Sequence, residues 1–394
     1  MLDKKLLPRA QIVEYNPASP APRNACTENT CRALLDKLQV WADDETTTKV
    51  YWLNGMAGTG KTTIAYSFSE ILHKKGLLGG TFFSSHLWVD TSDVCCIIPT
   101  ISLQLARKFP SLSHLILDVV EDDPNYSSRR IGKQFLNFMV KPLTAVYRNA
   151  RGVLVIVLDA LDECSDQSLV AELLSVILKD SKSLPVKFFI TSCPEVVLKK
   201  TFDHSWDHSN FILHEVEKEI VKAVIELYVK AYLHDKYNGD NWPAQAKLER
   251  LIDMCGILFI YAATVCKYIA PDKRDECSMP RCLSDVINSK LELTSSLNHP
   301  LHMLYQRILN AAYAHANERE RLDIDMALTA VVYVYNPLSR AAISALMQMP
   351  IEDTKAALSS LHSLVFIPSD SDMLISTCFC GPLLSMVYTS PFLF

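Results

Sequence analysis

The segment GMAGTGKT, Gly55 to Thr62, constrains this chain more than any other part of its sequence. It fits every fixed position of the pattern G-x-x-x-x-G-K-[ST], with a β-prone run, Val50 to Leu53, before it and a helical pattern after it. Glycines allow successive backbone N–H groups to point inward around a phosphate, and Lys61 adds a mobile positive charge. Glycine is scarce, at 11 of 394 residues, so a chance match is not expected. The segment therefore predicts a phosphate-binding loop.

The loop also predicts which residues hold the phosphates and a metal ion. The helix expected to start at Lys61 adds the positive end of its dipole. The Thr62 hydroxyl is a hard oxygen ligand of the kind that Mg²⁺ prefers. The residues expected to contact phosphate are Gly55, Met56, Ala57, Gly58, Thr59, Gly60, Lys61, Thr62 and Thr63.

A second candidate segment is VLVIVLDALDEC, in which an apolar run ends in a carboxylate. Asp159, at the carboxyl end of a buried strand, would reach Mg²⁺ through a water molecule. A carboxylate a few residues further on can polarise the attacking water; Glu163 is the first choice and Asp162 the second. A solvated acidic turn would explain this segment alone, but not its pairing with the phosphate loop.

The third candidate segment, KFFITSCPE, brings polar groups to the end of another predicted strand. Ser192 and Cys193 occupy the position from which a side chain can sense the terminal phosphate. A cysteine thiol is uncharged at neutral pH unless its surroundings perturb it.

The order of predicted elements gives the fold class. Strands expected at 50–53, 81–83, 153–158, 187–191 and 211–213 alternate with helices at 61–75, 95–107 and 169–178. This alternation is typical of an α/β fold with a parallel sheet and helices on both faces. Between residues 215 and 321 only helices are expected, at 217–236, 244–269 and 300–317. From Leu322, three helices (the last 351–364) and a hairpin give a winged-helix outline.

These patterns divide the chain into five parts. They are an extended lead-in (1–25), an α/β nucleotide-binding domain that opens with a helix at 29–41 (26–215), a helical domain (216–320), a winged-helix-like domain (321–376) and an apolar tail (377–394).

Composition and charge indicate the cellular compartment and the classes of partner that are expected. The formal net charge of −5 gives no electrostatic reason to expect nucleic acid. Twelve cysteines without regular spacing, in a chain without a secretory signal, indicate reduced thiols and a cytoplasmic protein. The apolar stretch 254–266 is too short to cross a bilayer, so a buried helix is expected. A tail anchor at 373–394 is disfavoured because Gly381-Pro382 and Pro391 interrupt it.

Together the motifs resemble the NACHT branch of the STAND P-loop NTPases, in particular fungal proteins with a nephrocystin-3-like nucleotide-binding region. The matching pieces, which span roughly residues 25–376, are YWLNGMAGTGKTTIA, LVIVLDALDEC, KFFITSCPE, GILFIYAAT, YNPLS and LHSL. The resemblance implies a nucleotide-gated switch that rests with ADP, exchanges it for ATP, self-associates and signals.

The chain departs from this family at three places. Relatives usually have arginine where this chain has Cys193, and an arginine is also common where it has His86. A thiol cannot replace a permanently charged guanidinium fork. The family's histidine-containing motif is replaced by STCFCGPLLSMVYTSPFLF, which suggests a truncated or frame-altered product.

The function expected from sequence is an ATP-preferring molecular switch with slow hydrolysis, acting in signalling or innate-defence-like self-association. ATP or ADP with Mg²⁺ is the expected ligand, although no motif distinguishes adenine from guanine and GTP stays an alternative. The alternative function is a nucleotide-binding scaffold without turnover, or a degenerate family member. A DNA-binding winged helix is a weaker hypothesis, since IEDTKAALSSLHSL has one lysine and two acids. A metabolic kinase is also compatible with the loop alone.

Overall fold

The structure is a computed structural model, and it divides into two compact units, Met1–Glu217 and Lys218–Phe394. It describes residues 26, 31–55, 58–85, 89–122, 130–147, 153–193, 196–203, 211–215, 218–236, 242–270, 279–288, 299–314, 316–334, 338–361, 364–366 and 374–377. The lead-in at 1–25 and the tail from 378 onward therefore lie outside the described residues.

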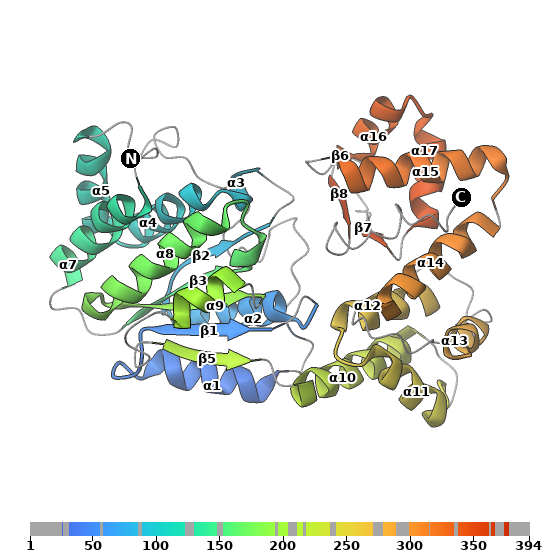
Figure 1. Cartoon of the computed structure of the whole chain (residues 1–394), viewed down its shortest axis with the longest axis horizontal. Coiled ribbons are helices and arrows are strands. Elements are labelled where there is room, and N and C mark those ends of the chain that lie inside the picture. The colour runs from blue at the N-terminus through green and yellow to red at the C-terminus, as the bar shows by residue number, and fades with distance from the viewer. Residues whose placement is uncertain are drawn as a thin grey trace. The chain divides into compact units, whose positions relative to one another are not determined.

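The first unit is built on a sheet of five parallel strands (Figure 1). Its order is β2-β3-β4-β1-β5. The strands are β1 (Val50–Asn54), β2 (Leu78–Phe83), β3 (Leu154–Asp159), β4 (Val186–Ser192) and β5 (Phe211–Glu215). Strand β4 therefore lies between the strand that precedes the glycine loop and the strand that ends in Asp159.

Helices cover both faces of this sheet, as the alternating pattern predicts. They are α1 (Arg32–Asp43), α2 (Lys61–Lys74), α3 (Val89–Ser92), α4 (Ile97–Lys108), α5 (Pro110–Asp122), α6 (Ile131–Phe135), α7 (Lys141–Tyr147), α8 (Gln167–Asp180) and α9 (Val196–Asp203). Short single turns lie at Val94–Cys96, Leu161–Glu163 and Ser181–Ser183, and a π-helical stretch lies at Leu136–Val140. The α/β fold with helices on both faces is thus confirmed.

The continuous apolar run of β3 is explained by burial on both sides. Ile156 and Leu158 join the core on the side of α4 to α9, whereas Val155 and Val157 join the core formed with α1 and α2. Successive strand side chains point to opposite faces, so a strand covered on both faces must be apolar at every position.

Lys187 is a buried cation inside this largely apolar sheet. The residue is fully buried in β4. The Lys187 Nζ donates to the carbonyl oxygens of Trp41 (2.5 Å) and Asp44 (2.6 Å) and to the Thr47 hydroxyl (2.7 Å). The ammonium also lies 5.1 Å from the centroid of the Trp41 ring. Burial lowers the pKa of Lys187 to about 8. The lysine therefore fastens the carboxyl end of α1 to the centre of the sheet.

The second unit begins with helices, and one of the helices predicted there is wrong. Its first helices are α10 (Lys218–Lys236), α11 (Gln245–Cys255), α12 (Phe259–Ile269), α13 (Met279–Ile287) and α14 (His299–Ala314). The single helix predicted over 244–269 is wrong, because α11 ends before Gly256, whose φ of 55° a non-glycine residue rarely adopts. No described helix is long and apolar enough to cross a bilayer.

The rest of the second unit has the winged-helix order of elements. Three helices, α15 (Glu318–Tyr333), α16 (Arg340–Met347) and α17 (Ile351–Ser360), are combined with strands β6 (Leu338–Ser339), β7 (Val365–Phe366) and β8 (Leu374–Thr377). The strands pair antiparallel in the order β6-β8-β7. Helix α17 ends earlier than the predicted Leu364, and Val365 and Phe366 lie in a strand as predicted.

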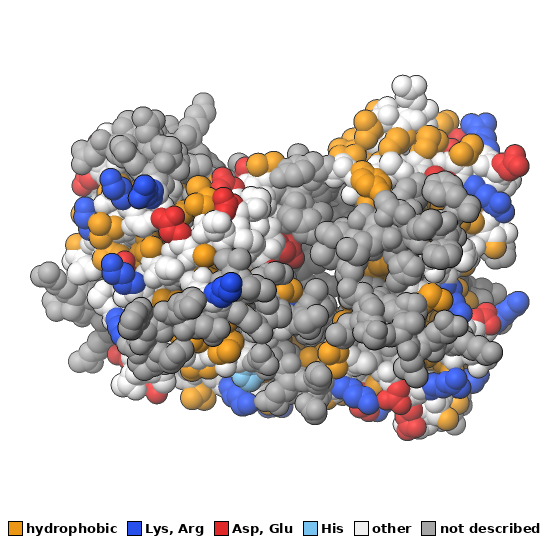
Figure 2. All heavy atoms as spheres, in the orientation of Figure 1, with side chains coloured by type: hydrophobic (Ala, Val, Ile, Leu, Met, Phe, Trp, Pro, Cys, Tyr) orange, Lys and Arg blue, Asp and Glu red, His pale blue; other side chains and the backbone are white. Residues whose placement is uncertain are grey.

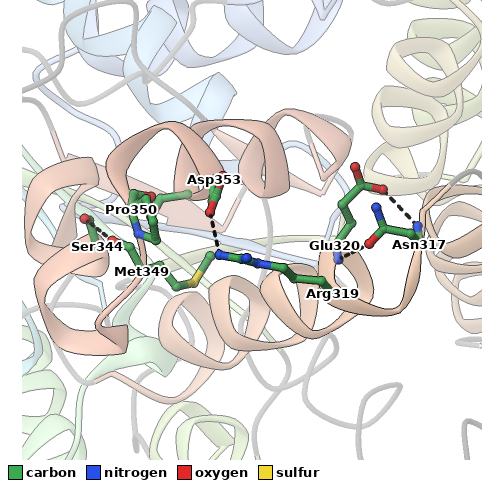
Figure 3. Close-up of polar contacts among 8 residues, drawn as sticks. Asn317, Arg319, Glu320, Ser344, Met349, Pro350 and Asp353 are labelled. Carbon is green, nitrogen blue, oxygen red and sulfur yellow. Dashed lines mark hydrogen bonds and ion pairs between the residues drawn. The ribbon is translucent and has the colours of Figure 1, made fainter.

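Local polar contacts fix the ends of these helices (Figure 3). Asn317 and Glu320 form a reciprocal capping box at the start of α15, with bonds of 2.9 and 2.8 Å. Arg319 lies 3.5 Å from Asp353 of α17, which joins the first turns of the two helices. This ion pair is exposed and contributes little to stability.

We predict that Lys187→Met lowers the free energy of unfolding by about 2 kcal/mol, because it removes charge-assisted hydrogen bonds to buried carbonyl groups. Urea unfolding followed by circular dichroism measures the change. Lys179→Met, on the exposed side of α8, is the matched control and should leave the midpoint unchanged. Equal midpoints for the two variants would show that Lys187 does not hold α1.

Candidate functional site

The candidate site lies where β1, β4 and β3 end at one edge of the sheet. Asn54 of β1 is in register with Ser192 of β4, and Leu158 of β3 is in register with Ile190. The residues that follow these positions are the glycine loop, Cys193 and Asp159. Parallel strands with helical crossovers bind ligands at their carboxyl ends, so this edge is the expected place for a site.

Two glycines of the loop have backbone conformations that other residues rarely adopt. Gly58 and Gly60 have φ values of 77° and 86°, in the left-handed region that favours glycine. Helix α2 begins immediately afterwards, at Lys61. Its first N–H groups and its dipole therefore face the loop, which is the arrangement that binds anions. Met56 and Ala57 lie outside the described residues.

Lys61 lies at the junction of the loop and β4. Its Nζ donates to the carbonyl oxygen of Gly55 at 2.7 Å and to the Cys193 Sγ at 3.5 Å. The residue is only 8% exposed, so its charge acts in a partly desolvated place. The structure thus brings together Lys61 and Cys193, which lie in different predicted segments. Thr62 and Thr63 follow in the first turn of α2 and are half-buried.

Asp159 is held by the end of the neighbouring strand. The Thr191 hydroxyl donates to Asp159 Oδ1 at 2.5 Å and accepts from the Ala160 N–H at 3.0 Å. The Asp159 carbonyl oxygen accepts from the Ser84 N–H at 3.0 Å. Asp159 is 1% exposed, and a carboxylate so deeply buried needs such partners. Its place at the end of β3, beside β4, is the place from which a carboxylate can reach a phosphate-bound metal ion.

The turn after β3 places the other two candidate carboxylates. Leu161–Glu163 form a single helical turn after Ala160, whose φ of 56° turns the chain sharply. Gln167 Nε2 donates to the carbonyl oxygens of Asp162 (3.1 Å) and Cys164 (3.0 Å), which braces the turn from α8. Asp162 and Glu163 are both half-buried.

Ser192 and Cys193 make different contacts. The Ser192 hydroxyl accepts a hydrogen bond from the Trp52 indole N–H at 2.8 Å, and Trp52 stacks on Phe202 of α9 with 4.1 Å between ring centroids. The Cys193 Sγ accepts a hydrogen bond from Lys61 Nζ. Burial raises the pKa of its thiol to about 12, the Lys61 charge opposes the rise, and Asp162 adds to it. The thiol is therefore protonated and uncharged at neutral pH.

Two residues of this edge have contacts that the sequence did not predict. Thr191 holds Asp159, and Trp52 holds Ser192. Their signal was weak, because a threonine and a tryptophan inside strands are ordinary β-sheet residues. A polar residue at the end of a buried strand was the one local hint. His86 and Glu195 lie outside the described residues.

These features together form a P-loop NTPase-like nucleotide-binding domain. The comparisons agree for the first unit: residues 29–193 match the family model described as nephrocystin 3, N-terminal. The resemblance to that region inferred from the sequence is thereby confirmed for this segment. No curated protein matches the sequence.

Several solved structures are similar at low identity. The Orc1 protein of Aeropyrum pernix in complex with DNA is 13% identical over 92% of this chain and 93% of that chain, with a TM-score of 0.39. AMPPCP-bound DnaA from Aquifex aeolicus is 11% identical over 87% and 91%, with a TM-score of 0.37. A single-residue variant of RuvB from Thermotoga maritima is 16% identical over 93% and 96%, with a TM-score of 0.32. The DNA and AMPPCP bound in these structures belong to those proteins.

We predict that Thr191→Val lowers the free energy of unfolding by about 2 kcal/mol, since it removes the hydroxyl from a buried carboxylate without changing the side chain's shape. Thr191→Ser keeps the hydroxyl and should recover more than half of the loss. Guanidinium unfolding curves of the three proteins test this. A valine variant as stable as the wild type would mean that the Thr191 bond does not support Asp159.

Proposed function

We propose that the chain, whose residues 29–193 match the nephrocystin 3, N-terminal, family model, is an ATP-preferring nucleotide-binding switch with slow hydrolysis. One observation carries the proposal. Lys61 starts α2 directly after two left-handed glycines and is buried at the end of β4, beside the strand that ends in Asp159. A cation, a helix N-terminus and a buried carboxylate at one sheet edge are what a magnesium-bound nucleotide requires.

The residues at this edge fit such a ligand. Residues Gly55 to Thr63 would hold the phosphates, with Lys61 on the oxygens of the β- and γ-phosphates. The Thr62 hydroxyl and the Asp159 carboxylate are the hard oxygen donors that would hold Mg²⁺. When bound, the metal ion would offset the charge of the phosphates. Adenine is favoured over guanine by the family resemblance alone.

Hydrolysis would use a carboxylate from the turn after β3. The family resemblance implies that the ADP-bound and ATP-bound states control self-association in signalling or in a defence-like response. The turn is placed by bonds from Gln167, so its carboxylates sit on a braced segment. We place this activity in the cytoplasm, with protein partners that the sequence does not name.

A scaffold that binds nucleotide without turnover is the second candidate, and Cys193 favours it. The thiol is protonated at neutral pH and contributes no positive charge to a terminal phosphate. Stabilisation of developing charge is the main source of catalysis in phosphoryl transfer. A site without an arginine here is expected to turn over slowly or not at all.

Binding of DNA through the winged helix is less well supported. Helix α17 presents Lys355 together with Glu352 and Asp353, and Asp353 faces Arg319. Among the described side chains that are coloured in Figure 2, basic and acidic groups are interspersed and do not form a basic surface. Phosphate contacts need clustered Lys and Arg residues, which supports nucleotide over nucleic acid as the ligand.

We predict that Lys61→Ala weakens binding of the magnesium–ADP complex by about 100-fold, the effect of losing one strong charge-assisted contact to phosphate. Isothermal titration calorimetry measures it. Lys74→Ala, at the exposed end of the same helix, is the matched control and should bind as the wild type does. Wild-type affinity in the Lys61 variant would remove the phosphate role from this loop.

A further inference from the structure

Asn54 ends β1 directly before the glycine loop, and its side-chain oxygen is buried without a donor. The residue is 1% exposed, and its Oδ1 accepts no hydrogen bond from the residues that the structure describes. A buried acceptor without a donor lowers stability, and in a native protein such a group often has a functional reason. The packing of the sheet therefore does not explain why an asparagine occupies this position.

Asn54 and Ser192 lie side by side on one face of the sheet. They are in register on the neighbouring parallel strands β1 and β4. Trp52 of β1 and Ile190 of β4, each two residues earlier, both belong to the core on the side of α4 to α9. Side chains of a strand alternate between its two faces, so Asn54 and Ser192 also face that side. Neighbouring strands are close enough for two such side chains to meet.

The Trp52 indole sets the direction of hydrogen bonding at this pair. An indole N–H only donates, and it donates to the Ser192 hydroxyl at 2.8 Å. The hydroxyl accepts this bond and keeps its own proton to donate. The Asn54 Oδ1 beside it is an acceptor that lacks a donor. Trp52, Ser192 and Asn54 can thus form a chain in which each group donates to the next.

Such a chain would end in a donor at the start of the phosphate-binding loop. Once Oδ1 of Asn54 accepts a bond, its amide N–H groups remain, and these only donate. The next residue, Gly55, begins the loop, and its N–H donates to the Ser192 carbonyl oxygen at 3.4 Å. Phosphate oxygens at neutral pH accept hydrogen bonds from such donors, and bonds in a chain strengthen one another. The free amide donors therefore match the ligand of the adjacent loop.

We propose that Asn54 is a phosphate-binding residue of the nucleotide site, outside the motif Gly55 to Thr62. Its amide N–H would donate to an oxygen of the α- or β-phosphate, while the Ser192 hydroxyl donates to its Oδ1. This inference rests on the proposed nucleotide binding. It explains why a group that lowers the stability of the free protein is present at the end of β1.

Two measurements on Asn54→Leu, which has nearly the same shape but no amide, test the proposal together. Isothermal titration calorimetry with the magnesium–ADP complex should show binding weakened by about tenfold or more, the loss of one charge-assisted hydrogen bond. Urea unfolding without nucleotide should show a midpoint equal to or above that of the wild type, because a buried acceptor has been removed. A residue with a merely structural role would lower the midpoint.

Two further variants separate the donor from the chain that orients it. Asn54→Asp keeps an acceptor for Ser192 but loses the N–H groups and adds a negative charge, so binding should weaken by about 100-fold. Ser192→Ala should weaken binding by about threefold in the wild type. It should cause no further loss in Asn54→Leu, because both residues act through one chain.

Ser181→Ala is the matched control for removal of a buried polar group. The Ser181 hydroxyl is also fully buried and has no hydrogen-bond partner among the residues that the structure describes. It lies in the turn before β4, at the edge of the sheet opposite the glycine loop. Magnesium–ADP affinity should therefore be that of the wild type.

Each other result overturns a stated part. Wild-type affinity in Asn54→Leu overturns the phosphate contact and leaves the nucleotide-binding function standing. Weaker binding together with a lower unfolding midpoint assigns the amide a structural role instead. Asn54→Asp that binds more tightly than Asn54→Leu contradicts the donor, and independent losses in Ser192→Ala and Asn54→Leu remove the chain. A wild type that binds no nucleotide overturns the proposed function as well.

Discussion

Strand β4 is hydrogen-bonded to β1 on one side and to β3 on the other, and the polar end of the nucleotide-binding unit depends on that insertion. Three consecutive residues at its end each contact a different neighbour. Thr191 holds Asp159 of β3, Ser192 accepts from Trp52 of β1, and Cys193 contacts Lys61 of α2. Parallel register makes these contacts possible, because it brings the carboxyl ends of all three strands to one edge.

The same insertion explains how charges are accommodated near the core. Asp159 is buried but bonded to a hydroxyl, and Lys61 is buried but bonded to a carbonyl oxygen. Further from this edge in β4, buried Lys187 is likewise bonded to carbonyl oxygens, which lie at the end of α1. Buried charges cost free energy unless partners compensate them, so each is tied to a specific partner on another element. The site is thereby held by the sheet and not by its loops alone.

A neutral thiol at Cys193 gives this edge its particular character. Proteins of the family that the sequence resembles usually have an arginine at this position, which would add a permanent charge. The thiol adds none, but it can accept a hydrogen bond from Lys61. The proposed consequence is a site suited to holding nucleotide, with little power to stabilise charge on a departing phosphate.

Local sequence predicted most elements of the first unit but not their contacts. Apolar runs located β1, β3 and β4, and the position of Asp159 followed from where its run ended. Strand order is a tertiary property, so the bonds of Asp159 to Thr191 and of Lys61 to Cys193 could not be read from spacing. Lys187 shows the same limit, since its partners are about 140 residues earlier in the chain. The break at Gly256 was missed because the apolar pattern continues on both sides of the glycine.

The central claim is that Gly55 to Thr63 and Asp159 bind a nucleotide. Mass spectrometry of small molecules released from purified, denatured protein tests it most directly. We predict close to one adenine nucleotide per wild-type chain, carrying two or three phosphates, and almost none from Lys61→Ala. Wild-type protein that releases no nucleotide and binds none of the added ADP, ATP or GTP in the presence of Mg²⁺ would contradict the claim.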